Sequence, residues 1–280
     1  MKKKVVHFFI IILLLSSCNK KQDTLCVMTY NIRYDTSNDG INQWKNRKEK
    51  VVDLIKDHDP DIFGIQEGLF HQVAYLDSML VDYTYCGTGR DDGKTGGEYS
   101  ALFYKSSVWE ILDCNTSWLS PNPESAEKPW DAAFPRIITM INALHQNTRD
   151  TFFIINTHFD HIGDTARKES AKIIRNLIEK NHTKKILVLG DFNCTPESEP
   201  YKILTSNAHL LFDSYATAKH IQGPGGTFAS EFHVDNLGNE RIDHIFTNLE
   251  NIKKYKIIDQ QEKGHFPSDH LPVLIEVAIK

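Results

Sequence analysis

The chain has 280 residues, of which 40% are hydrophobic and 25% are charged, so it contains enough apolar material for a sizeable globular core. Its formal net charge is −5. This charge argues against tight, sequence-independent binding to nucleic acid, because such binding depends on a basic surface.

The N-terminal residues have the pattern of a bacterial export signal. Three lysines at positions 2–4 precede an apolar stretch over 5–15, which is too short to span a bilayer, since spanning needs roughly 20 residues. Leu15-Ser16-Ser17-Cys18 resembles a lipobox, which implies a signal peptide over 1–17, acylation of Cys18 and a lipidated tether over 18–24. The alternative is an uncleaved or conventionally cleaved signal. We expect an exported lipoprotein, periplasmic or at the cell surface, anchored to a membrane through Cys18.

From Leu25 onwards the chain alternates between apolar, β-prone runs and amphipathic segments. We expect strands at 25–30, 62–65, 100–104, 108–112, 137–144, 152–157, 186–190, 242–247, 252–258 and 273–279, and helices at 47–57, 71–80, 166–179 and 201–204. In the helix over 47–57, for example, Val51, Leu54 and Ile55 share one face. Since no linker interrupts this pattern, residues 25–280 are predicted to form a single α/β domain, and we expect a monomer.

Two regions lack such a pattern. The first is a glycine-rich stretch over 87–97, and the second is one long irregular segment over 115–136 that contains Trp118 and Trp130. Long irregular segments are often functional. These aromatic side chains either line a substrate pocket or fill a hydrophobic gap.

Four cysteines follow Cys18, at irregular spacing. Cys26 and Cys114 lie in apolar segments and are predicted to be buried thiols. An oxidising compartment would permit disulfides, but the spacing of Cys26, Cys86, Cys114 and Cys194 assigns no pairing.

Polar residues suited to a metal or a phosphate lie at the ends of several predicted strands. Asp191 and Asn193 follow the strand over 186–190, and their side chains point the same way because the side-chain period of a strand is two. Alone, such residues are equally typical of an ordinary turn or a helix cap. The pattern recurs, however, at Asn31, Glu67, His158, Asp160, Asp243, Asp269 and His270.

These residue types have a common chemical logic. Mg²⁺ prefers oxygen ligands and few protein carboxylates, and phosphate-ester hydrolysis needs a metal, donors to the phosphate oxygens and a base for water. Zinc is less expected, because no close His/Cys cluster is present in the sequence.

The ordered motifs YNIRYD, DIFGIQEG, NTHFDH, GDFNCTP, RIDHIF and SDHLPV resemble the motif series of the endonuclease/exonuclease/phosphatase superfamily, over essentially residues 25–280. The resemblance implies a DNase I-like fold. This is a four-layer α/β sandwich, in which two packed mixed β-sheets are flanked by helices and the site lies at one end of the sheets.

The same resemblance implies roles for individual residues. Glu67 would be the principal Mg²⁺ ligand, with Mn²⁺ as a possible substitute, Asp269 would lie beside the metal, and Asn31 would be a neighbour of the metal or the phosphate. The remaining predicted catalytic residues act on the phosphate and the water. His158 would donate to the scissile phosphate, and Asn193 would support it. Asp191 would orient or activate the water, while Asp243 would orient His270; the division of roles between Asp191 and His270 stays open.

Three further positions are weaker candidates. Arg136 would contact a substrate phosphate or, alternatively, form a surface ion pair, and Asp160 and Glu98 would support the motifs. One departure from the pattern is Arg33, which stands where some nucleases of the superfamily have an acidic residue. This departure disfavours a second metal site of that kind, and the number of metals stays open.

Together these features predict a Mg²⁺-dependent phosphoric ester hydrolase, acting as a phosphatase or phosphodiesterase on a phosphorylated small molecule. A secreted nuclease with the same residues is the first alternative, disfavoured by the acidic charge. A sphingomyelinase-like enzyme would need an apolar docking loop, for which only 118–130 qualifies. A catalytically silent binding lipoprotein is the alternative outside the enzymes, disfavoured because every acidic and histidine position is present.

Overall fold

The computed structural model describes residues 23–207 and 209–279. The predicted signal peptide, 1–17, and residues 18–22 of the predicted tether lie outside the described residues. The first strand, β1 (Asp23–Asn31), begins two residues before the predicted strand. Among the described residues, no helix has the length and apolar character needed to cross a membrane.

The strands of the described residues form two mixed sheets. One has seven strands in the order β10-β12-β13-β1-β2-β4-β3, and the other has six in the order β5-β6-β7-β8-β11-β9. In those orders, the strands of the first sheet are Ile221–Gln222, Ile252–Ile257, Val273–Ile279, Asp23–Asn31, Ile62–Gln66, Leu102–Lys105 and Tyr83–Cys86. Those of the second are Trp109–Trp118, Ile137–His145, Thr151–His158, Lys185–Asp191, Asp243–Thr247 and Phe212–Asp213. The pairs β1–β2, β7–β8 and β10–β12 are parallel.

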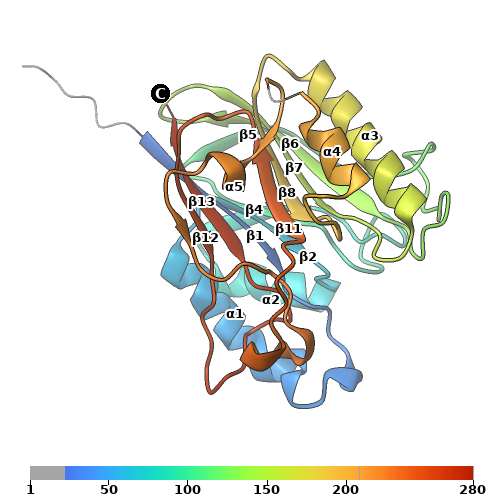
Figure 1. The fold of residues 1–280 in the computed structure, drawn as a ribbon, viewed down its shortest axis with the longest axis vertical. Coiled ribbons are helices and arrows are strands. Elements are labelled where there is room, and N and C mark those ends of the chain that lie inside the picture. Colours follow the sequence, from blue (N-terminus) through green and yellow to red (C-terminus); the bar gives the residue numbers. More distant parts are fainter. Residues whose placement is uncertain (1–22, 208, 280) are drawn as a thin grey trace, which may run out of the picture.

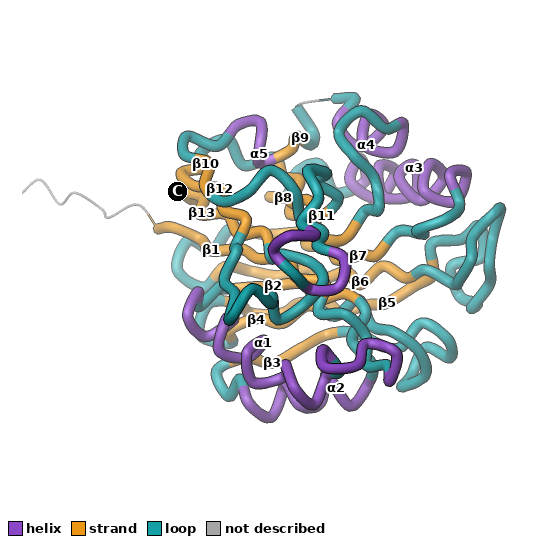
Figure 2. The backbone as a smooth tube through the Cα atoms, turned by 60° about the horizontal axis from the view of Figure 1, so that its bottom comes forward, coloured by secondary structure: helices purple, strands orange, loops and turns teal. Residues whose placement is uncertain are grey.

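Helices cover the outer faces of both sheets, which gives the four predicted layers (Figures 1 and 2). The helices α1 (Trp44–His58) and α2 (Phe70–Met79) pack on the seven-stranded sheet, and α3 (Asp164–Lys180) and α4 (Glu199–Thr205) pack on the six-stranded sheet. Shorter elements are α5 (Ser214–Thr217) and the 3₁₀ helices Ser37–Asn42, Ser230–Phe232 and Val234–Asn236. The predicted fold class, a DNase I-like α/β sandwich, is confirmed.

Central strands bury both of their faces, which explains their continuous apolar sequences. In β8, Leu187 and Leu189 point into the core between the two sheets, while Ile186 and Val188 point towards α3 and α4. β7 divides its side chains in the same way. Because successive side chains alternate between faces, a strand between two apolar layers needs apolar residues at every position.

Two predictions about irregular structure were wrong. Residues 115–118 belong to β5, so the irregular segment covers only 119–136. β5 is an edge strand that is exposed over 112–115, so its sequence lacks the apolar run by which buried strands are recognised. The prediction of a single long irregular segment also fails, because 223–242 contains only two short 3₁₀ helices.

Cys86 and Cys114 form a disulfide between β3 and β5, which are edge strands of different sheets. Cys114 is exposed, so its prediction as a buried thiol was wrong, and Cys26 is only half-buried. Such a bond across 28 residues stabilises a fold by roughly 3 kcal/mol, mainly by restricting the unfolded chain.

Candidate active site

The predicted site residues meet at one end of the two sheets. Asn31 ends β1, Glu67 follows β2, His158 ends β7 and Asp191 ends β8. Since β1–β2 and β7–β8 are parallel pairs, their carboxyl ends share an edge, where Asn31 is in register with Gln66 and His158 with Asp191. β11 runs antiparallel to β8, so its first residue, Asp243, lies opposite Asp191. The topology therefore brings together residues that are far apart in the chain.

These residues surround a cleft of about 620 Å³. The predicted site residues that line the cleft are Glu67, Arg136, His158, Asp191, Asn193, Asp269 and His270, together with the weaker candidate Glu98. Asn31 and Asp243 are buried beneath this surface and act through their contacts with lining residues. A volume of this size is typical of a site for a small molecule.

His270 lies between two carboxylates. Its Nδ1 is 2.9 Å from Oδ2 of Asp243, and its Nε2 is 3.7 Å from Oδ2 of Asp191. Burial disfavours the charged imidazole, but the two carboxylates outweigh it and hold the pKa of His270 well above its ordinary value. The ring is therefore a cation whose Nδ1–H donates to Asp243 and whose Nε2–H is directed towards Asp191.

Asp191 lies at the centre of the site. Its Oδ1 accepts from the backbone N–H of Asn193 at 2.9 Å, and its Oδ2 accepts from Nδ2 of Asn31 at 3.0 Å. Burial and the nearby Asp243 carboxylate raise the pKa of Asp191 to about 7. A carboxylate of this pKa can accept and release a proton near neutral pH.

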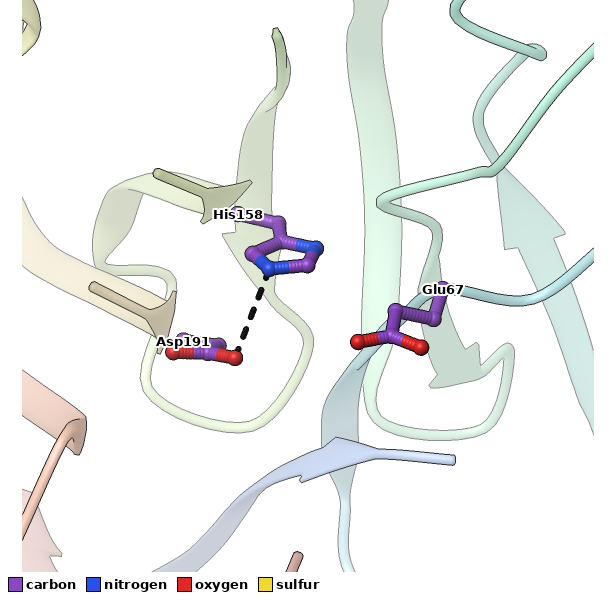
Figure 3. A group of neighbouring side chains, drawn as sticks. All are labelled: Glu67, His158 and Asp191. Carbon is purple, nitrogen blue, oxygen red and sulfur yellow. Dashed lines mark ion pairs between the residues drawn. The ribbon is translucent and has the colours of Figure 1, made fainter. Parts of the chain in front are cut away.

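His158 approaches the same oxygen of Asp191 as His270, with its Nε2 3.4 Å from Oδ2 (Figure 3). Burial, followed by the charges of Arg136 and Arg90, lowers the pKa of His158 well below its ordinary value. Its imidazole is therefore neutral, in contrast to His270. The two histidines thus contact one carboxylate in different charge states.

Glu67 faces Asp191 and His158 from the seven-stranded sheet (Figure 3). Its φ of 64° lies in the left-handed region that non-glycine residues seldom adopt, a strain often found at functional sites. Its carboxylate accepts from Nδ2 of Asn31 at 3.0 Å and from the backbone N–H of Tyr34 at 3.2 Å. Burial opposes ionisation, but His270, the Asn31 amide and Arg33 together lower the pKa of Glu67, so it is ionised.

The donor set suits a hard divalent cation. Ligand atoms of Glu67, His158 and Asp191 all lie within 4.8 Å of one another, and two of the three groups are carboxylates. Asn31 directs its amide nitrogen, not its oxygen, at the two carboxylates, while its Oδ1 accepts from the backbone N–H of Arg33. As a metal ligand, Asn31 would therefore need its amide rotated by 180°.

Arg33 and Asp269 lie next to this group. The Nη1 atom of Arg33 is 3.9 Å from Oε2 of Glu67 and 3.8 Å from Oδ2 of Asp269, and its guanidinium is also paired with Asp39. Burial and the negative charge of Glu67 raise the pKa of Asp269 to about 6, although the nearby His270 cation lowers it. The Arg33 guanidinium thus provides a permanent positive charge beside Glu67.

Asn193 and Arg136 line the cleft, but protein groups already occupy part of their hydrogen-bonding capacity. Nδ2 of Asn193 donates to the carbonyl of Phe159, and Nε of Arg136 is 3.3 Å from Oδ2 of Asp160. Arg136 is only 5% exposed, so its ion pair is a buried one and the predicted alternative of a surface pair does not apply.

Asp160 positions the loop before β6. Its buried carboxylate accepts from the backbone N–H groups of Ala133, Phe134, Ile162 and Gly163 as well as from Arg136. Burial opposes ionisation, but these donors hold the pKa of Asp160 at about 2. The predicted supporting role of Asp160 is thus a structural one.

Apart from Arg33, five lining residues were not assigned from the sequence: Tyr34, Arg90, Phe134, His161 and Phe228. Arg90 and Phe134 lie in the two regions that showed no regular pattern, and His161 directly follows Asp160. For Arg90 and Phe134, the irregularity of these two regions was the only feature of the sequence that indicated a role in the site.

Comparisons with known proteins agree with this geometry. The model of the endonuclease/exonuclease/phosphatase family matches residues 28–270. The crystal structure of an endonuclease/exonuclease/phosphatase from Bacteroides vulgatus is 38% identical, with a TM-score of 0.86, and the match covers 92% of this chain and 100% of that one.

A mannosyl-6-phosphatase from Bacteroides thetaiotaomicron is 33% identical, with a TM-score of 0.86, over 91% of this chain and 100% of the other. The CCR4-Not complex 3′-5′-exoribonuclease subunit Ccr4 of Mycosarcoma maydis is 22% identical over 92% of this chain, which spans about half the length of that relative. The chain therefore belongs to the endonuclease/exonuclease/phosphatase family, whose members are phosphoester hydrolases.

Proposed function

We propose that the protein is a Mg²⁺-dependent hydrolase that cleaves a phosphoester bond of a small phosphorylated molecule by attack of water. The observation that carries this proposal is the continuous set of contacts from Asp243 through His270 and Asp191 to Asn31 and Glu67 within one cleft. Mn²⁺ would substitute for Mg²⁺, since both accept oxygen ligands.

The charge states of the side chains favour a division of roles. His270, held as a cation by Asp243, donates from Nε2 to a phosphoryl oxygen, and neutral His158 donates a second hydrogen bond. Asp191, with its pKa of about 7, takes the proton of the attacking water as the water oxygen bonds to phosphorus and the bond from phosphorus to the leaving oxygen breaks. The leaving oxygen departs as an alkoxide, which takes up a proton from solvent. A divalent cation at Glu67 would neutralise the charge on the phosphoryl oxygens.

The charge balance of the cleft supports a small substrate over nucleic acid. Each of the three arginines that line the cleft has a carboxylate partner: Asp39 for Arg33, Glu98 for Arg90 and Asp160 for Arg136. Polyanion binding requires basic groups free to pair with successive phosphates. The likeness to a mannosyl-6-phosphatase points the same way, towards a phosphomonoester.

An assay with purified protein tests this proposal. We expect Mg²⁺ or Mn²⁺ to support turnover of p-nitrophenyl phosphate, EDTA to abolish it, and added metal to restore it. Oligonucleotides, bis(p-nitrophenyl) phosphate and phospholipid vesicles test the nuclease, diesterase and sphingomyelinase alternatives. The control Glu110→Gln removes an exposed carboxylate on β5 and should leave the rate unchanged. Turnover that persists in EDTA would refute the mechanism.

We also propose that the protein is exported and anchored to a membrane through acylated Cys18. The lipobox-like sequence supports this, and so does the Cys86–Cys114 disulfide, since such bonds persist in oxidising compartments. In cells, Cys18→Ser should move the protein from the membrane fraction to the soluble fraction, whereas Cys26→Ser should not. Unchanged fractionation of Cys18→Ser would contradict the anchor.

A further inference from the structure

The part of the cleft beyond His158 contains residues that the mechanism above does not use. Arg90, Glu98, Phe134 and His161 all line the cleft, and we call this set the loop subsite. Nη1 of Arg90 is 2.6 Å from Oε2 of Glu98, and the Arg90 guanidinium lies 4.8 Å from the centre of the Phe134 ring. The rings of Phe134 and His161 are stacked, with their centres 5.9 Å apart.

Contacts outside the cleft hold the loop subsite in place. The indole Nε1–H of Trp118 donates to the carbonyl of Arg90 at 2.7 Å, and the backbone N–H of Arg90 donates to the carbonyl of Glu98. Asp160 fixes Phe134 through its backbone N–H, as described above. Trp118 thus supports the pocket instead of lining it. A subsite held in this way loses little conformational entropy when a ligand binds.

The loop subsite begins one imidazole ring away from the reacting groups. Nδ1 of His158 is 3.9 Å from Oε2 of Glu98, while Nε2 of the same ring is 3.4 Å from Oδ2 of Asp191. A phosphoryl group bound at Asp191 and His158 would therefore place its ester substituent within reach of Glu98. This is the position of the leaving group in a phosphomonoester.

The chemistry of the loop subsite matches a ring that carries hydroxyl groups. Glu98 supplies carboxylate oxygens that accept from hydroxyls, and Arg90 supplies a guanidinium that donates to them. Phe134 is 42% exposed and offers an apolar surface for the C–H groups of such a ring. Because the charge of Arg90 is already paired with Glu98, a neutral substituent suits this subsite better than a second phosphate.

We propose that the loop subsite binds the sugar, or another cyclic polyol, of a phosphomonoester and thereby sets the substrate specificity of the enzyme. This inference rests on the proposed phosphoester hydrolysis and adds the class of the leaving group to it.

The test compares a hexose 6-phosphate with ethyl phosphate, two alkyl monoesters that differ in the part that would reach the loop subsite. In the wild type, kcat/KM for the best hexose 6-phosphate of a panel should exceed that for ethyl phosphate by at least about 10-fold. Phe134→Ala and Glu98→Gln should each lower this ratio by about 10-fold or more, mainly by raising KM for the sugar phosphate. Phe134→Tyr keeps the aromatic ring and should retain most of the wild-type ratio.

Trp130→Ala is the matched control, because Trp130 is an exposed aromatic residue of the same loop that does not line the cleft. In Trp130→Ala, the ratio of kcat/KM for the hexose 6-phosphate to kcat/KM for ethyl phosphate should equal that of the wild type. If the wild type shows no preference for any hexose phosphate, or if neither subsite variant changes the ratio, the inference is overturned while hydrolysis itself stands. If the wild type hydrolyses neither ester, the proposed function itself fails.

Discussion

Replacing His270 with alanine is expected to lower kcat by roughly 10³-fold while the fold stays intact. The variant loses a cationic donor at the position where negative charge develops on the phosphoryl group, and such donors contribute about 10²- to 10³-fold each. It also leaves Asp191 and Asp243 without the cation between them, so both roles of the ring disappear together. Steady-state kinetics at saturating Mg²⁺ would measure the effect, and circular dichroism would confirm folding.

Asp243→Asn tests the positive charge of His270 while the imidazole ring itself is retained. The amide keeps the size of the side chain but removes the carboxylate that raises the pKa of the imidazole. A raised pKa keeps the ring protonated up to higher pH, so the variant should lose activity at a lower pH than the wild type on the alkaline side. We expect kcat at neutral pH to be about 10- to 100-fold smaller, because the loss of a positioned proton donor typically costs about this much or more. An unchanged pH profile, or near-wild-type turnover of His270→Ala, would refute these assignments.

Much of this site was predictable because its residues follow from strand geometry. Asn31, Glu67, His158 and Asp191 lie at the carboxyl ends of strands whose apolar sequences are unambiguous, and parallel pairing brings such ends to one edge. Buried central strands such as β7 and β8 are apolar at every position, so their ends are easily recognised. The motifs, in order, identified the family that the comparisons then established.

Other features depend on contacts that the sequence does not encode locally. β5 lacks a continuous apolar run because it is an edge strand with an exposed part over 112–115, and the Cys86–Cys114 bond joins two edge strands that are distant in the chain. Arg90 and Phe134 lie in irregular segments, whose course depends on Asp160 and on the indole of Trp118. The direction of the Asn31 amide likewise depends on Arg33, whose backbone N–H donates to its oxygen. Such positions become visible only in three dimensions.

An effect as large as that of His270→Ala is expected for Glu67→Gln, which should weaken Mn²⁺ binding at least about 100-fold and reduce turnover roughly 10³-fold. It removes a full charge from the group of Glu67, His158 and Asp191, whose ligand atoms lie close enough together to hold a divalent cation. Isothermal titration with Mn²⁺ measures the affinity without reference to activity. Glu98→Gln is the matched control, since it makes the same isosteric change in the same cleft outside that group, and its Mn²⁺ affinity should stay within a few-fold of wild type.

Stability measurements distinguish loss of the metal from damage to the fold. Burial, together with the charge of Glu67, raises the pKa values of both Glu98 and Asp269, so the charge of Glu67 repels theirs in the absence of metal. The pKa of Glu67 is nevertheless lowered overall by His270, the Asn31 amide and Arg33, so its charge is net stabilising in the fold. The melting temperature of the metal-free Glu67→Gln variant should therefore lie slightly below that of the wild type. Because a ligand stabilises only a state that binds it, Mg²⁺ should raise the melting temperature of the wild type but not of the variant. An equal Mg²⁺-induced shift of the melting temperature in both proteins would mean that the metal binds elsewhere in the protein. That result would contradict the role of Glu67 as a metal ligand.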